Sequence, residues 1–69
     1  MSNRVKINGV KLTELIDEKN IPLYAFAALA EVSTVALRRM RRGLVCNKLT
    51  AEAVAKALKV ELSEIVEGE

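Results

Sequence analysis

The sequence has no histidine and no tryptophan, and it contains only one cysteine, one proline and three glycines. A single cysteine, Cys46, excludes an internal disulfide, and without histidine the usual Cys/His metal site cannot be assembled. Glycine is too scarce for a Gly-rich phosphate loop, and no nucleophile, base and orienting group occur together in a catalytic pattern. These absences predict a protein that is not an enzyme and that holds no metal and no cofactor.

Long apolar runs are also missing from the chain. The longest, Ile21 to Ala30, is far shorter than the roughly 20 residues that span a bilayer, and it contains Pro22. The first residues lack the apolar segment of a signal peptide, and a lone cysteine fits a reducing compartment. We therefore expect a cytoplasmic protein without a membrane-spanning segment.

Only two aromatic side chains, Tyr24 and Phe26, occur among the 69 residues, whereas 51% of the chain is apolar. The core must therefore be mainly aliphatic, with both aromatics fully or partly inside it. A chain of this length forms one domain, and folding buries only about 60% of the surface that the unfolded chain exposes. We predict a single domain, 1–69, with a short N-terminal arm, 1–9, and a frayed C-terminus, 67–69.

The charges sum to only +2, but they are unevenly distributed along the chain. Residues 31–48 hold five basic side chains against Glu31, a balance of +4, while the charged residues of 61–69 are all acidic. Segregation of this kind attracts an anion to one face and repels it from the other. We therefore expect an anionic partner to bind the basic segment.

Apolar residues recur at helical spacing in five segments, and no strand of ordinary length is apparent. The sequence predicts helices at 11–19, 23–30, 34–42, 51–59 and 62–66. The predicted boundary residues are Pro22 for the second helix, Ser33 or Thr34 as the cap of the third, Gly43 as its end and Thr50 as the cap of the fourth. Residues 1–9 are expected to be extended and to end in an Asn8-Gly9 turn, and 44–49 to form a loop. The predicted fold class is all-α, with five short helices around one core.

The segment 26–43 is the most informative part of the chain, because a short apolar helix, a tight turn at 31–33 and a basic helix follow one another in it. On a helical wheel, one side of the basic helix carries Ser33, Ala36, Leu37, Met40 and Leu44. The opposite side carries Thr34, Val35, Arg38, Arg39 and Arg42, with Arg41 at the border. Like charges at these spacings repel on an isolated helix, so an anionic partner explains them better than a solvated face does. The pattern is typical of a DNA-binding helix-turn-helix.

With these features the chain resembles the phage repressor and Cro type helix-turn-helix family, also called the XRE family. The matching residues are Phe26-Ala27, Val32-Ser33, Leu37, Met40, Gly43 and the run 55–60, and the match spans roughly residues 10–66. The resemblance implies a compact five-helix, lambda-repressor-like domain that regulates transcription by reading double-stranded DNA in the major groove with helix 34–42. It also implies base reading by Thr34, Val35, Arg38 and Arg39, and phosphate contacts from Ser33, Arg42, Asn47 and Lys48.

The chain departs from the family pattern at three places. Glu31 stands where the family's turn usually has glycine, so a residue with a Cβ would have to take a left-handed conformation. Leu23 stands where the family often has a glutamine that contacts DNA. Ile16 and Arg41 replace an Arg–Glu pair, and because both partners are gone together, neither leaves a buried charge unpaired.

A module of this size is expected to bind its operator as a homodimer, with Leu44, Val45, Ile65 and Val66 as interface candidates. Its mechanism would be binding and occlusion, without a small-molecule substrate and without a membrane. The alternative is a protein-interaction module on the same fold, antirepressor-like or antitoxin-like, whose basic face binds an acidic protein. Two residues also have plainer explanations: Val35 as an ordinary exposed valine and Cys46 as a small loop hydrophobe.

Overall fold

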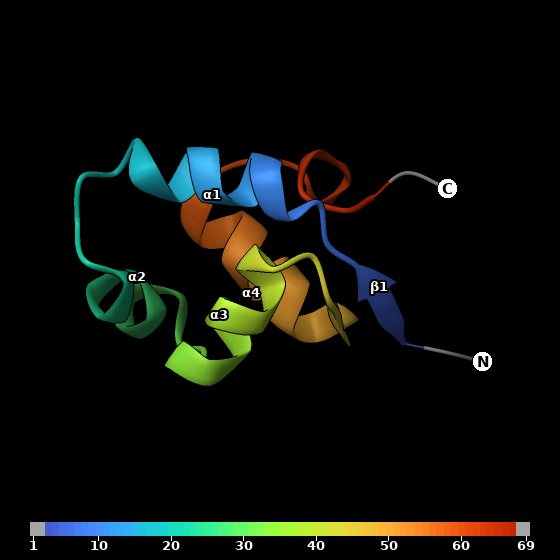
Figure 1. The fold of residues 1–69 in the computed structure, drawn as a ribbon. Helices are drawn as coiled ribbons and strands as arrows, with labels where there is room; N and C mark the ends of the chain where they lie inside the picture. The colour runs from blue at the N-terminus through green and yellow to red at the C-terminus, as the bar shows by residue number, and fades with distance from the viewer. Residues whose placement is uncertain (1–2, 68–69) are drawn as a thin grey trace.

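The computed structural model describes residues 3–67 (Figure 1). In chain order these residues form β1 (Arg4–Lys6), α1 (Gly9–Asp17), α2 (Leu23–Ala30), α3 (Thr34–Arg41), β2 (Val45–Asn47), α4 (Lys48–Leu58) and a 3-10 helix, η1 (Leu62–Glu64). The prediction of an all-α, five-helix, lambda-repressor-like fold is therefore wrong. The described residues form an α+β domain of four α-helices and a two-stranded antiparallel sheet.

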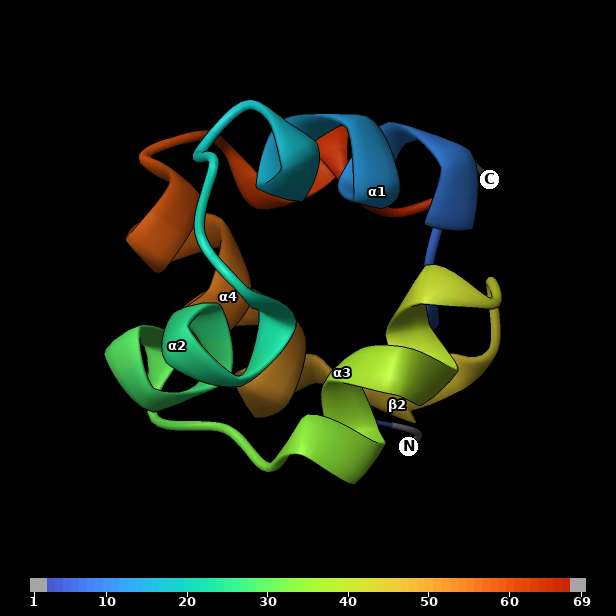
Figure 2. The same cartoon turned by 60° about the vertical axis from the view of Figure 1, so that its left-hand side comes forward.

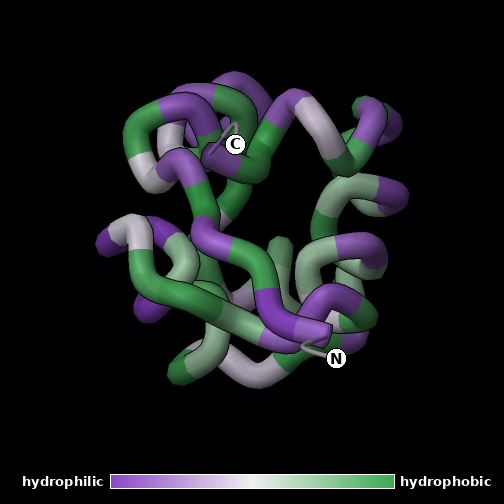
Figure 3. The backbone as a smooth tube through the Cα atoms, turned by 90° about the vertical axis from the view of Figure 1, so that its right-hand side faces the viewer, coloured by the Kyte–Doolittle hydropathy of each residue, from purple (hydrophilic) through white to green (hydrophobic). Residues whose placement is uncertain are grey.

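The sheet joins the N-terminal segment to the segment after α3. β1 pairs with β2 so that Val5 lies opposite Cys46, and hydrophilic and hydrophobic residues alternate along β1 (Figure 3). Ile7 continues the pairing through an antiparallel bridge to Val66, and its side chain is fully buried. From residue 3 onward the predicted arm is therefore part of the fold, while residues 1–2 lie outside the described part of the chain.

The C-terminal segment is held to the same strand. A single 3-10 turn, η1, replaces the predicted α-helix at 62–66. Glu67, a predicted frayed residue, donates its backbone N–H to the carbonyl of Lys6 at 2.8 Å, and the Lys6 ammonium lies 3.9 Å from Glu67 Oε1. Of the predicted frayed end, only residues 68–69 lie outside the described residues. The segment from η1 to Glu67 is thus held against the N-terminal strand and its continuation.

Asparagine caps explain why two helices begin earlier than predicted. Asn8 Oδ1 accepts a hydrogen bond from Lys11 N at 3.1 Å, so α1 starts directly after Asn8 and no separate turn precedes it. Asn47 Oδ1 accepts one from Leu49 N at 2.7 Å, so α4 starts directly after Asn47. Thr50, the predicted cap, lies inside that helix. The predicted bounds of α2 are confirmed, and α3 ends one residue earlier than predicted.

The helices enclose one core that is aliphatic apart from Phe26. α2 and α3 lie side by side below α1, and α4 packs against α2 and η1 (Figure 2). The buried core residues are Ile7, Leu12, Ile16, Phe26, Ala27, Ala30, Leu37, Met40, Ala51, Val54, Ala55, Leu58 and Ile65. Tyr24, a predicted core residue, is instead 71% exposed on α2. None of the helices in the described part of the chain combines the length and the apolarity that crossing a bilayer requires.

Candidate nucleic-acid interface

The turn between α2 and α3 is built on a left-handed residue that is not glycine. Glu31 ends α2 with φ 60° and ψ 41°. Its backbone N–H donates a hydrogen bond to the carbonyl of Ala28 at 3.2 Å, and the N–H of Val32 donates one to the carbonyl of Ala27 at 3.0 Å. These two bonds satisfy carbonyl groups in the last turn of α2. The left-handed geometry typical of this turn is therefore present, at a conformational cost because Glu31 carries a Cβ.

Ser33 fixes the start of α3. Its Oγ accepts a hydrogen bond from Ala36 N at 3.0 Å, which confirms Ser33, and not Thr34, as the cap. At the other end, Gly43 has φ 80°, and its N–H donates to the carbonyl of Met40 at 2.9 Å. α3 is thus closed at both ends by residues predicted for these positions, Ser33 and Gly43.

The orientation of α3 about its axis follows from its two core residues. Leu37 and Met40 are fully buried. The opposite side is exposed and carries Val35, Arg38, Arg39 and Arg42, which we call the basic face of α3. Val35 is 67% exposed, while Thr34, the first residue of the helix, is half-buried. Three of the four predicted base-reading residues therefore lie on one surface, with Thr34 at its edge.

The predicted phosphate-contacting residues lie on and around the basic face, at both ends of α3 and at the junction of β2 and α4. Ser33 precedes α3, Arg42 follows it, and all four, Ser33, Arg42, Asn47 and Lys48, are exposed. Asn47 and Lys48 are not in a loop, as predicted, but at the end of β2 and the start of α4. The capping bond uses Asn47 Oδ1 and leaves the side-chain amide nitrogen as a donor.

A shallow cleft of about 280 Å³ connects the basic face with the sheet, and we call it the β2 cleft. Its lining residues are Arg4, Ser33, Val35, Ala36, Arg39, Val45, Cys46, Asn47 and Thr50. Sequence reasoning missed Arg4, which reaches this surface because β1 pairs with β2 and sets Arg4 opposite Asn47. Burial raises the pKa of the Cys46 thiol, and the positive charge of Arg4 opposes this shift with a smaller effect. Cys46 is therefore a neutral thiol at physiological pH.

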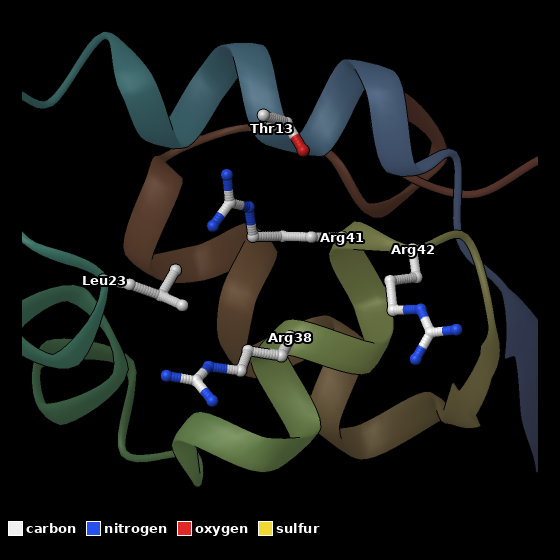
Figure 4. A pocket seen from close by; sticks show the side chains of 5 residues that line it. All are labelled: Thr13, Leu23, Arg38, Arg41 and Arg42. Atoms are coloured by element: carbon white, nitrogen blue, oxygen red, sulfur yellow. The ribbon is translucent and has the colours of Figure 1, made fainter.

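A second, larger cleft of about 540 Å³ lies on the other flank of the basic face, between α1, the start of α2 and α3, and we call it the α1–α3 cleft. Thr13, Leu23, Arg38, Arg41 and Arg42 line it (Figure 4). Arg41 is half-buried, and its Nε is buried without a hydrogen bond to any described residue. Arg41 stands only at the border of the helical wheel, and the expectation that no buried charge is left unpaired at this position is not met.

In the described part of the chain, the arginines in α3 and directly after it lie without a carboxylate partner. Within residues 3–67, no ion pair joins Arg38, Arg39, Arg41 or Arg42 to an aspartate or glutamate. No group of three or more His, Cys, Asp or Glu side chains in the same residues could hold a metal ion. The arrangement can therefore bind an anion through charge and guanidinium hydrogen bonds.

Not all of the residues predicted for a dimer interface are exposed. Ile65 is fully buried in the core, so it cannot form an interface. Leu44 and Val66 are half-buried, and Val45 is 39% exposed. The short β2 strand and the bridge from Ile7 to Val66 explain this loss of exposed apolar surface.

The comparisons with known proteins supply no family for this chain, since no protein-family model, no curated protein sequence and no solved structure matches it. Function must therefore be inferred from the basic face of α3 and from the two clefts that flank it. All three surfaces carry arginine and meet along one helix.

Proposed function

We propose that the chain is a regulator of the repressor or Cro type, which binds double-stranded DNA by inserting α3 into the major groove. The observation that carries this proposal is the basic face of α3. Its three arginines are exposed together, and no carboxylate in residues 3–67 pairs with them. The major groove admits one α-helix, and an exposed basic helix held from behind by its buried side fits that groove.

The position of each side chain along α3 suggests what it reads. Thr34 and Val35 are at the N-terminal end, the part of a recognition helix that contacts base edges. Arg38 and Arg39 follow one turn later, and arginine pairs bidentately with guanine O6 and N7. Val35 offers only apolar contact, for which the thymine methyl group is the matching partner. We therefore expect a half-site with a G·C pair facing Arg39 and a thymine beside it.

The polar residues around the basic face are suited to the DNA backbone. Ser33, Asn47 and Lys48 are exposed at helix starts, and Arg42 is exposed directly after α3. Hydroxyl, amide and cationic donors of this kind hold phosphates, which fixes the register of a protein on DNA without reading sequence. Occupation of the site would then exclude other proteins from the same DNA.

A single α3 contacts too few base pairs for tight binding at physiological salt. We therefore propose a homodimer on DNA, with the half-site centres about 34 Å apart, which is one helical turn. Of the interface candidates, Leu44, Val45 and Val66 keep some exposure. An inverted repeat in the bound DNA would be the direct mark of this symmetry.

Selection from a random pool of duplexes, followed by gel shifts across a salt series, tests the proposal. We expect an inverted-repeat consensus and a steep loss of affinity with salt. The matched control is Lys56→Gln on α4, which removes one positive charge outside the basic face and should select the same consensus. Retention of the chain by an acidic protein, with no binding to any duplex, would contradict the proposal and favour a protein-interaction module.

A further inference from the structure

We propose that the α1–α3 cleft is a binding site for a phosphate group, with Arg41 as its main ligand. The cleft shares Arg38 and Arg42 with the DNA contacts proposed above, but those contacts give neither Arg41 nor Thr13 a role, so this site goes beyond them. The cleft of about 540 Å³ is large enough for a phosphate group together with part of the molecule that carries it. Its walls come from three helices, α1, α2 and α3.

The charge of the cleft is the first argument. Arg38, Arg41 and Arg42 line it, and within residues 3–67 none of them forms an ion pair. Cations spaced three and four residues apart on one helix repel one another. A dianionic phosphate removes this repulsion and accepts charge-assisted hydrogen bonds from several guanidinium groups at once.

The environment of Arg41 is the second argument. Its Nε is buried and makes no hydrogen bond within the described residues, whereas buried polar groups are nearly always paired. No hydrogen bond within residues 3–67 opposes a rotation of the Arg41 side chain that turns Nε toward the cleft. Nε and a terminal nitrogen then form the planar fork that binds two oxygens of one phosphate group.

The remaining lining residues suit a phosphate ligand. The hydroxyl of Thr13 points from α1 toward the cleft, and the guanidinium of Arg41 reaches from α3 toward α1 (Figure 4). Leu23 gives the cleft an apolar wall, which limits water and so strengthens the charged hydrogen bonds beside it. Asp17 lies one helical turn beyond Thr13 on α1 and forms no ion pair with the arginines. Its charge opposes an anion in the cleft and limits the affinity.

Inorganic phosphate is the probe for the first test. The full chain, labelled with ¹⁵N, is titrated with phosphate at an ionic strength held constant with sodium chloride, and the amide shifts are followed by NMR. We expect saturable binding with the largest shifts at Thr13, Leu23 and residues 38–42. Arg41→Gln should weaken the binding about tenfold or more, as expected for the loss of a bidentate charged contact. Asp17→Asn should strengthen it.

The matched control is Arg39→Gln, which makes the same change on the same helix but outside the α1–α3 cleft, and it should leave the phosphate affinity nearly unchanged. Arg41→Lys keeps the charge without the fork and should fall between wild type and Arg41→Gln. If Arg41→Gln does not fold, Arg38→Gln and Thr13→Val replace it, and each of them should weaken phosphate binding. The absence of saturable shifts, or an equal effect of Arg39→Gln and Arg41→Gln, would overturn the proposal.

The phosphate group can come from a small molecule or from the DNA backbone, and a second experiment separates these sources. If it comes from DNA, Arg41→Gln weakens duplex binding, and phosphate competes with the duplex more strongly than chloride does at equal ionic strength. If it comes from a small molecule, phosphate binds and Arg41→Gln binds the duplex as wild type does. The titration requires no DNA, so its result stands whether or not the proposed DNA binding fails.

Discussion

The backbone of Gly9, at the start of α1, lies directly against the backbone of Arg41, at the end of α3. A Cβ on Gly9 would overlap the carbonyl oxygen of Arg41 and would lie 2.8 Å from the backbone nitrogen of Gly43. Backbone atoms cannot rotate out of the way as the end of a side chain can. Glycine therefore permits the close approach that sets α1 over α3 and positions Arg41 beneath Thr13.

Gly9→Ala is expected to lower the free energy of unfolding by about 1–3 kcal/mol, the usual cost of an overpacked contact, although alanine is the better helix former. Urea denaturation measures this loss. Gly43→Ala is the control for the neighbouring glycine, because its Cβ would have ordinary contacts, 3.5 Å from Ile7 O, and only its positive φ is costly. Unchanged stability of Gly9→Ala would show that a Cβ fits between the backbones of Gly9 and Arg41.

Glu31→Gly is expected to raise the free energy of unfolding by a few tenths to about 1 kcal/mol, because it relieves a left-handed residue of its Cβ. The gain is limited because glycine also increases the freedom of the unfolded chain. Thermal unfolding followed by circular dichroism detects the change. Glu31→Ala removes the same carboxylate but keeps the Cβ, so it should show no such gain. A lower melting temperature of Glu31→Gly would contradict the prediction that the left-handed conformation of Glu31 costs stability.

Asn47→Ala is expected to cost about 0.5–2 kcal/mol of stability, because it removes the side chain that caps α4. Thr50→Ala, at the cap position that the sequence suggests, should cost less, since Thr50 lies inside the helix. Both are compared by urea denaturation without DNA, so that phosphate contacts play no part. An equal loss in the two variants would speak against the Asn47 cap.

The thiol of Cys46 predicts a pH dependence of stability. Its pKa in the folded chain is raised by burial, so the folded state holds the proton more tightly than the unfolded state. The contribution to stability is therefore complete below the ordinary pKa of an exposed thiol and is lost as the pH rises through the raised pKa of the folded state. Denaturation at a series of pH values should show this decline in the wild type and not in Cys46→Ala. Arg4→Gln should raise the pKa of the thiol further.

The helices α2 and α3 and the turn between them could be predicted from the sequence, because their signals are local. Apolar residues at helical spacing, the Ser33 cap and Gly43 gave α2 and α3 nearly to the residue. The sheet could not, because each strand has only three residues and the two are far apart in the sequence. In the sequence, only the alternation of Val5 and Ile7 with polar neighbours indicates the first strand of this sheet.

The candidate site divides in the same way. The exposed positions of Val35, Arg38 and Arg39 follow from the helical wheel, which needs only the spacing of one helix. The positions of Arg4 and Arg41 depend on tertiary structure. The pairing of β1 with β2 brings Arg4 next to α3, and the packing of α1 against α3 places Arg41 in the cleft that suggests its proposed role. For the same reason Ile65, apolar and near the C-terminus, could not be recognised as core until its neighbours were known.

Two arginines on the basic face of α3 are predicted to have different roles, base reading for Arg39 and phosphate binding for Arg42. Arg39→Ala is expected to cost about 1–3 kcal/mol on the selected duplex, to lose much less on random DNA and to relax the preference for guanine. Arg42→Ala, directly after the helix, should weaken both duplexes about equally and reduce the salt slope by about one unit. The two variants remove the same charge from the same face, so each is the control of the other.

Binding of Arg39→Ala and Arg42→Ala to the selected and to a random duplex across a salt series tests the proposed mode of DNA recognition most directly. We predict that only Arg39→Ala loses affinity selectively on the selected duplex. If Arg39→Ala weakens both duplexes alike and leaves the selected consensus unchanged, the basic face holds phosphates without reading bases, and the proposed sequence-specific recognition by α3 is wrong.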